Sequence, residues 1–284
     1  MRKVTIKAPA TSANLGVGFD TMGIAFNIYN TYTFEESDEY ELVGFDDEYL
    51  DNNLVLSSYK KLFQEIKKDE VKVKITQVSA SIPTSRGLGS SACCIVCGVL
   101  GANYMLGNIF NIDEIIDFAS MIEGHPDNVL PCILGSLVTG FSNMGEVFYT
   151  KYNVNNSLHF TLLVPNFELE TSVSRKALPS EVSFKEMVQN MQKAVNLPVI
   201  LSSGNFYALR SATRNAIHEK YRYPLISGAE KIRYELEDEN HIVLISGAGP
   251  TLLVISDKDD EIKLDNNKWQ VIKTTINKKG VMIK

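Results

Sequence analysis

The sequence predicts an α+β fold with two lobes that meet near residue 150, one over residues 1–150 and one over residues 151–284. Two observations predict this architecture. Strand-like and helix-like segments are mixed along the chain, without the regular alternation that marks a parallel doubly wound sheet. The chain of 284 residues, with 44% hydrophobic and 22% charged residues, is also long enough for two domains with real hydrophobic cores.

Strands are predicted at the start of the chain. Strand-favouring residues in partial alternation predict strands at residues 3–9, 28–36 and 40–45. The spacing of apolar residues over 53–68 predicts a helix, and the clearest strand of the sequence follows over 71–83.

Two helices are predicted next, at about 91–105 and at 112–123. Asn111 and Glu114 are spaced as in a capping box, which starts the second of these helices. Gly124 and Pro126 end it and lead into a turn. In the second half, strands are predicted at 135–143, 146–150 and 158–165, helices near 183–198 and 203–219, a strand pair over 241–256, and two short closing strands.

Charge and hydropathy exclude several classes of partner. A net charge of −6 argues against nucleic acid, which needs a basic surface. The first ten residues are strand-like and charged, without the apolar segment of a signal peptide. The longest apolar run, 92–106, is too short to span a bilayer. We therefore expect a cytoplasmic protein without a membrane partner.

Four cysteines stand at positions 93, 94, 97 and 132. Cys94 and Cys97 form a CxxC pair, which raises a redox or zinc interpretation. A closed zinc site needs four ligands, and no second CxxC or histidine pair accompanies this one. We interpret the cysteines as small apolar side chains on a tightly packed helix, kept reduced in the cytosol.

The stretch IPTSRGLGSSACC, residues 82–94, joins a glycine- and serine-rich loop to an apolar helix. Read as a dinucleotide fingerprint, GLGSSA lacks the acidic residue expected about 20 positions later. Gly87 and Gly89 let backbone N–H groups approach an anion closely. Ser90 and Ser91 stand where a helix begins, with its free N–H groups and positive dipole end. The loop therefore favours phosphate binding, against the alternative of a plain helix cap.

Three other motifs are weak when each is taken alone. EGHPDNV, residues 123–129, crowds polar side chains onto a rigid loop after a helix, or is simply a polar turn. PATSANLGVGFD, residues 9–20, leaves a strand through small residues and ends in a carboxylate. SGAGPT, residues 246–251, is a glycine turn between apolar strands.

Together and in this order, the four motifs resemble the small-molecule kinase superfamily that includes galactokinase, homoserine kinase, mevalonate kinase and phosphomevalonate kinase. Within it, ATSANLGVGFDTMGIA and EGHPDNV are similar to the homoserine kinases, as are ETSVSRKALP at 170–179 and YRYPLI at 221–226. The resemblance runs from residue 4 to about 256 with few gaps. It implies an N-terminal lobe like domain 2 of ribosomal protein S5, a ferredoxin-like C-terminal lobe, and ATP in the cleft between them.

The resemblance implies an ATP site with Mg²⁺. Ser91 and Glu123 would bind the metal, and Asn53 would line the adenine pocket. The SGAGPT turn would support the phosphate loop. The loop that wraps the phosphates would consist of Pro83, Thr84, Ser85, Arg86, Gly87, Leu88, Gly89, Ser90, Ser91 and Ala92.

The resemblance also implies a site for L-homoserine, phosphorylated on its side-chain hydroxyl as a step toward threonine. Arg175 and Arg222 would hold the substrate carboxylate, since a guanidinium fork suits that group. Asp20 would hold the ammonium, and Asn14 and His125 would add polar contacts. The oligomeric state stays open, with a homodimer among the alternatives.

The resemblance also implies a catalytic role for Asn128, in the HPDN loop, where several kinases of the superfamily have an aspartate near the reacting hydroxyl and the homoserine kinases have asparagine. An amide orients a hydroxyl but cannot accept its proton at neutral pH, and phosphoryl transfer tolerates this because it relies on positioning and charge neutralisation. Whether Asp127 turns toward the substrate stays open. The alternatives are a superfamily kinase for mevalonate or shikimate, a catalytically silent relative, and an NAD-binding oxidoreductase. Mevalonate has no ammonium for Asp20 to bind, which argues against it.

Overall fold

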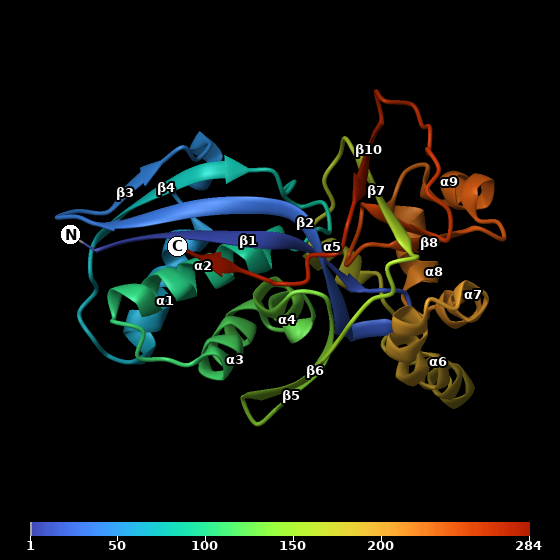
Figure 1. Ribbon diagram of the computed structural model, residues 1–284, viewed down its shortest axis with the longest axis horizontal. Coiled ribbons are helices and arrows are strands. Elements are labelled where there is room, and N and C mark those ends of the chain that lie inside the picture. Colours follow the sequence, from blue (N-terminus) through green and yellow to red (C-terminus); the bar gives the residue numbers. More distant parts are fainter. Residues whose placement is uncertain (1) are drawn as a thin grey trace.

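A computed structural model describes residues 2–284 and contains two β-sheets with helices packed on them (Figure 1). The first sheet runs in the order β11-β1-β2-β4-β3, and β5 and β6 extend it from β2. Its pairs are antiparallel except β3 with β4. Its strands are β1 (Lys3–Asn14), β2 (Gly18–Glu36), β3 (Glu41–Val43), β4 (Val73–Ala80), β5 (Leu137–Asn143), β6 (Glu146–Tyr152) and β11 (Met282–Ile283).

The hairpin of β1 and β2 is longer than the sequence predicted. The expected strand ended at residue 9, but β1 continues to Asn14 and β2 already begins at Gly18. The alternation of polar and apolar residues stops near Pro9, because both faces of the strand are buried there: Ala8, Ala10 and Ala13 are at most 1% exposed. Periodicity alone cannot identify a strand that is buried on both faces.

Four helices cover one face of the first sheet (Figure 1). They are α1 (Leu54–Glu65), α2 (Ser90–Met105), α3 (Ile112–Glu123) and α4 (Pro126–Leu134). The predicted capping box at Asn111 and Glu114 is present at the start of α3. Helix α3 ends at Glu123 before Gly124, as predicted, but the loop expected to carry His125, Asp127 and Asn128 is only two residues long, because Pro126 is the first residue of α4. Proline suits that position, where its missing N–H has no helical partner and its φ is already helical.

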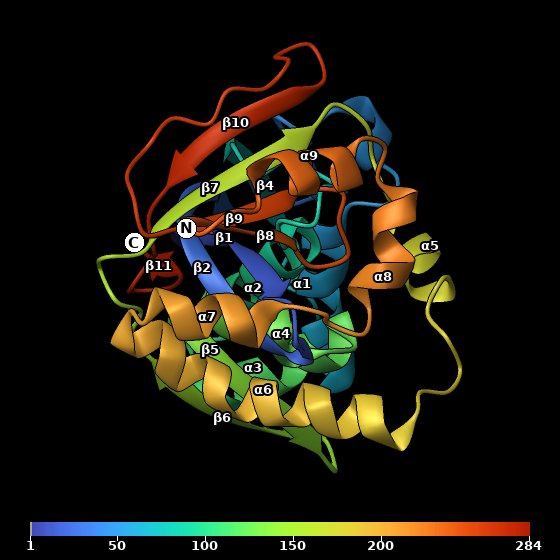
Figure 2. The same cartoon turned by 90° about the vertical axis from the view of Figure 1, so that its right-hand side faces the viewer.

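The second sheet is antiparallel in the order β10-β7-β9-β8. The helix expected over 203–219 is broken, because Gly204 ends α6 in a left-handed conformation and the chain bends again after α7. Figure 2 shows α6 and α7 side by side. The elements are β7 (His159–Pro165), α5 (Thr171–Lys176), α6 (Phe184–Ser203), α7 (Phe206–Thr213), α8 (Glu219–Arg222), α9 (Ala229–Leu236), β8 (His241–Ile245), β9 (Leu252–Ser256) and β10 (Trp269–Thr274).

One hydrophobic core continues from the first sheet into the second. It joins α2, for example Val96, to the inner face of the second sheet at Leu162 and Leu253, all fully buried. The chain passes from β6 to β7 between residues 152 and 159, and β11 returns to pair with β1 (Figure 1). The boundary near residue 150 stays a prediction. None of the described helices is long and apolar enough to cross a membrane.

Candidate active site

A cleft of about 710 Å³ lies where the two sheets meet. Its walls come from the β1–β2 hairpin, the glycine loop before α2, the α3–α4 junction, α5, α8 and the turn at 246–251. All but two of the predicted site residues line it; the exceptions are Leu88 and Ala92. The side chains of these two are fully buried, because they anchor the glycine loop and α2 to the core.

The glycine loop is held in place by the turn at 246–251, as expected. The Ser246 hydroxyl donates to the carbonyl oxygen of Gly87 at 2.7 Å, and the Thr251 N–H donates to the carbonyl of Arg86. Gly87 has a positive φ, and a Cβ there would overlap the Ser246 carbonyl. Gly89 has a positive φ as well, and a Cβ there would overlap the Thr11 hydroxyl. These close approaches explain why the loop uses glycine.

Helix α2 starts directly at this loop. Its N-cap is Gly89, whose lack of a side chain leaves the first N–H groups of the helix uncapped. Such groups, with the positive end of the helix dipole, form an anion site. Asn53, predicted at the adenine pocket, uses its side-chain oxygen to cap α1 at the Leu56 N–H and also lines the cleft.

Ser91 and Glu123 meet beside the start of α2, at the predicted phosphate end of the cleft. The Ser91 hydroxyl donates to a Glu123 carboxylate oxygen at 2.6 Å. Burial raises the pKa of Glu123, and the hydrogen bond from Ser91 only partly offsets this. A buried carboxylate beside a hydroxyl has the oxygen chemistry that Mg²⁺ prefers, so the two predicted metal ligands fit such an ion.

Asp20 and Arg175 form a bidentate ion pair across the predicted substrate side of the cleft. The two Arg175 nitrogens donate to the two Asp20 oxygens at 2.9 and 2.7 Å. Asp20 is on β2 and Arg175 on α5, so the pair joins the first sheet to the helix that follows β7. The Asn14 side-chain oxygen accepts from the Asp20 N–H, and its amide donates to the carbonyl of Gly247.

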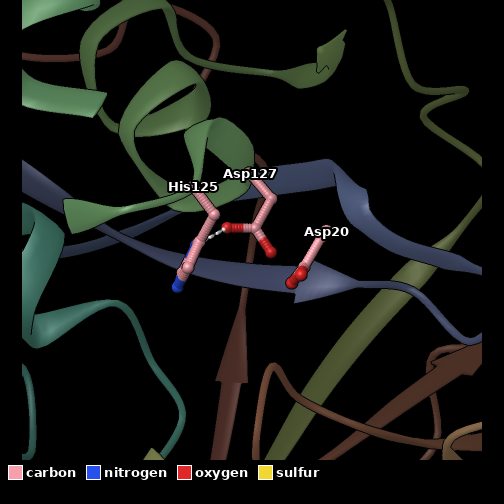
Figure 3. A group of neighbouring side chains, drawn as sticks. All are labelled: Asp20, His125 and Asp127. Carbon is pink, nitrogen blue, oxygen red and sulfur yellow. Dashed lines mark hydrogen bonds and ion pairs between the residues drawn. The ribbon is translucent and has the colours of Figure 1, made fainter. Parts of the chain in front are cut away.

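His125 and Asp127 lie opposite Asp20, at the start of α4 (Figure 3). His125 Nδ1 is 2.5 Å from an Asp127 oxygen. Burial lowers the pKa of His125, but the hydrogen bond to Asp127 and its charge outweigh burial and raise it overall. The Asp127 side chain is almost fully buried and lines the cleft, facing Asp20. Ligand atoms of Asp20, His125 and Asp127 lie within 4.8 Å of one another.

Arg222 is a buried cation at the same end of the cleft. It is 1% exposed, and one of its terminal nitrogens donates to the carbonyl of Gly247 at 3.0 Å. Within residues 2–284, no carboxylate forms an ion pair with it. Burial, and then the nearby Arg175, lower its pKa to about 10. A buried guanidinium without a carboxylate is costly unless a ligand supplies the anion.

Asn128 is fixed by its neighbours. The Thr11 hydroxyl donates to the Asn128 side-chain oxygen at 2.7 Å, and the amide nitrogen lies 3.4 Å from Asp127 Oδ1. The Asp127 carboxylate assigns the orientation of the amide, because a carboxylate only accepts and the group that faces it must be the NH₂. The second hydrogen of this NH₂ is not used by Asp127, and Asn128 lines the cleft.

Sequence reasoning missed the far end of the cleft and two residues that contact its lining, Thr11 and His218. The far end is lined by Tyr32, Phe45, Tyr49, Asn52 and Gln77. The rings of Tyr32 and Phe45 stack at 5.9 Å. No sequence signal could have found these residues, because they come from two strands, a short helical turn and two loop positions with ordinary patterns. Thr11 lies in the motif of residues 9–20, but its role was not predicted. The role of His218 was not predicted either.

The four cysteines are free, as expected. Cys93, Cys97 and Cys132 are buried, and burial raises the pKa of Cys97 and Cys132. Cys94 lines the cleft, and burial raises its pKa to about 12. Thiols so protonated are poor nucleophiles and poor metal ligands, which agrees with a packing role.

Comparisons with known proteins decide the family. The model "GHMP kinases N terminal domain" matches residues 53–136, from the cap of α1 to the end of α4. A homoserine kinase from Clostridium beijerinckii is 36% identical over 292 residues, covering 99% of this chain and 98% of the relative. The chain belongs to the homoserine kinase family. As a member of this family of GHMP kinases, it uses ATP.

Solved structures share the fold of this homoserine kinase family member. The crystal structure of homoserine kinase from Cytophaga hutchinsonii has a TM-score of 0.84 at 24% identity, covering 100% of this chain and 98% of that one. Mevalonate diphosphate decarboxylase from Staphylococcus aureus has a TM-score of 0.75 at 14% identity, with the same coverage. The expected two-lobed α+β fold is therefore confirmed. Because a decarboxylase shares the fold, the chemistry must be argued from the site.

Proposed function

We propose that the chain transfers the γ-phosphoryl group of ATP to the side-chain hydroxyl of L-homoserine, giving O-phospho-L-homoserine for threonine biosynthesis. The observation that carries the proposal is Arg222, a buried cation in the cleft that has no carboxylate partner among residues 2–284. A substrate carboxylate would complete it. The full-length similarity to curated homoserine kinases supports the same substrate.

The negative charges of Asp20 and Asp127 support an ammonium group on the same substrate. Asp20 and Asp127 bring two carboxylates within 4.8 Å of each other, and like charges so close favour a cation between them. Arg175 and His125 each balance only one of the two. A zwitterion whose ammonium lies at these carboxylates and whose carboxylate lies at Arg222 and Arg175 satisfies all four side chains. Mevalonate and shikimate have no ammonium, so the pattern disfavours them.

The phosphate end supports ATP as the donor. The glycine loop and the uncapped start of α2 suit the phosphates, and the pocket beyond them, near Asn53, suits the base. Ser91 and Glu123 would hold Mg²⁺, which when bound neutralises phosphate charge. The residues Pro83 to Arg86 would cover the phosphates from the loop side.

We infer that no protein group acts as general base. Asn128 cannot accept a proton at neutral pH, and its fixed amide nitrogen can orient the substrate hydroxyl. One carboxylate oxygen of Asp127 already accepts a hydrogen bond from His125. The hydroxyl proton would leave late, to a phosphate oxygen or to water, as a loose transition state allows.

An ADP-release assay against a panel of amino-acid and isoprenoid alcohols tests the function. We expect turnover with L-homoserine, a ³¹P signal of a phosphate monoester in the product, and little turnover with mevalonate or shikimate. Preferred turnover of an uncharged or purely anionic alcohol would refute the assignment. We also expect the enzyme to work in the cytosol. A homodimer stays a proposal that sedimentation velocity tests.

A further inference from the structure

His218 is buried beside Arg222 but does not line the cleft. It is 3% exposed and precedes α8, the short helix that carries Arg222. Its Nε2 lies 2.8 Å from the carbonyl oxygen of Gly16, and its Nδ1 lies 3.4 Å from Arg222 Nη1. One ring therefore links the β1–β2 turn to the buried guanidinium.

The two contacts fix the tautomer. A carbonyl oxygen only accepts, so Nε2 must carry the hydrogen that is donated to Gly16. Neutral imidazole has one N–H, which leaves a lone pair on Nδ1 to accept from Arg222. Burial, and then the charge of Arg222, lower the pKa of His218 to about 4, so the ring stays neutral at physiological pH.

Each contact reaches a substrate-side residue. Gly16 lies in the turn between Asn14 and Asp20. Arg222 Nη1 also donates to Gly247, so His218 and Gly247 together hold one edge of the guanidinium. The ring of Phe19 packs against both, 5.2 Å from the ring of His218 and 5.0 Å from the Arg222 guanidinium carbon. Such a shell around a charged side chain limits its rotamers.

We propose that His218 is a positioning residue, which orients Arg222 through Nδ1 for the substrate carboxylate and anchors the β1–β2 turn through Nε2–H. The proposal rests on the proposed function, because it assigns Arg222 to the carboxylate of homoserine. The proposal gives the side chain two tasks. Nδ1 contributes to substrate recognition through Arg222, and Nε2–H contributes to stability by anchoring the β1–β2 turn.

Two near-isosteric variants separate these tasks. In His218→Asn the amide oxygen stands near the position of Nδ1, so the acceptor for Arg222 is kept and the donor to Gly16 is lost. In His218→Gln the amide nitrogen stands near the position of Nε2, so the reverse holds. We expect His218→Gln to raise the KM for homoserine about tenfold, with the KM for ATP within about twofold. We expect His218→Asn to keep both KM values within about threefold and to lower Tm by about 4 °C.

A double-mutant cycle tests whether His218 acts through Arg222. In an Arg222→Ala background, His218→Gln should change the KM for homoserine less than twofold. His159→Gln, at the first residue of β7 and away from the cleft, is the matched control and should match wild type. If the Asn and Gln variants change the two KM values equally, His218 is only a packing residue. The same follows if His218→Gln raises the KM for homoserine as much in the Arg222→Ala background as in wild type. If wild type does not phosphorylate homoserine at all, the proposed function fails, and this inference fails with it.

Discussion

The guanidinium of Arg175 binds both carboxylate oxygens of Asp20, at 2.7 and 2.9 Å. The sequence predicted these two residues as ligands for opposite ends of the substrate, but here they bind each other. The hydrogen bond to Asp20 raises the pKa of Arg175, and partial burial offsets part of this increase. Under the proposed function, the arriving zwitterion exchanges this one pair for two, its ammonium with Asp20 and its carboxylate with Arg175.

Asp20→Asn should therefore impair homoserine binding even though it frees Arg175. The Asp20 side chain is 35% exposed, so loss of a charge-assisted contact there should cost roughly 1.5–3 kcal/mol, or about 10- to 150-fold in KM. The KM for ATP should stay within about threefold. Steady-state kinetics measure both constants, and Asp38→Asn, on an exposed turn, is the control. An improved KM for homoserine would mean that Asp20 only competes with the substrate for Arg175.

Ser91→Ala should raise the Mg²⁺ concentration needed for half-maximal turnover. The hydroxyl does not cap α2, so its loss should cost less than about 1 kcal/mol of stability. Mg²⁺ titrations of turnover measure the effect. Ser57→Ala, in the first turn of α1, is a matched control. Wild-type turnover of Ser91→Ala at every Mg²⁺ concentration would refute the metal assignment.

Asp127→Asn tests for a general base. Asparagine can still accept from His125, so the fold should survive. A base contributes typically 10²–10⁴-fold, whereas our account keeps kcat within about tenfold, roughly 1.4 kcal/mol of barrier. The KM for homoserine should rise, because one of the two carboxylates near the ammonium is lost. A thousandfold loss of kcat in a variant that binds both substrates normally would make Asp127 the base.

Much of the phosphate side could be predicted from the sequence, because it depends on local chemistry. The glycine loop, the capping box at Asn111 and the turn at 246–251 each lie within a few residues of chain. The pair of Asp20 with Arg175 joins residues 155 positions apart, so no local pattern could reveal it. Two short closing strands were predicted, but the pairing of the last one, β11, with β1 across the whole chain was not, because it too depends on distant residues.

Gly89→Ala should destabilise the protein more than alanine does at a comparable glycine, Gly107. It should also impair ATP use. Alanine at Gly89 meets both a positive φ and the Thr11 hydroxyl, whereas Gly107 has a positive φ with open space around it. Gly107→Ala should cost about 1–2 kcal/mol of stability from backbone strain alone. Gly89→Ala should cost more and should also raise the KM for ATP at least tenfold. Thermal unfolding and ATP kinetics compare the two; equal effects would contradict the close packing of the loop.

Glu219 should make stability depend on pH. Its carboxyl is 2% exposed, and burial raises its pKa from 4.5 to about 7. Because the folded pKa is the higher one, this contribution to stability is complete below pH 4.5 and is lost as pH rises toward 7. At about 1.36 kcal/mol per pH unit, wild type should lose about 3 kcal/mol relative to Glu219→Gln between these limits. Thermal unfolding of both proteins from pH 4.5 to 8 measures the difference, and a constant difference would contradict it.

The central claim is that the cleft recognises both charged groups of its acceptor, with Arg222 at the carboxylate. The most direct measurement compares kcat/KM for L-homoserine with the values for 3-aminopropan-1-ol, which lacks the carboxylate, and 4-hydroxybutyrate, which lacks the ammonium. We predict that each truncation lowers kcat/KM by about 1000-fold or more, since buried charges are left unpaired. Arg222→Ala should lower kcat/KM for homoserine but change that for 3-aminopropan-1-ol less than about threefold. If either truncated alcohol is turned over as well as homoserine, or if Arg222→Ala affects both alcohols equally, the account is wrong.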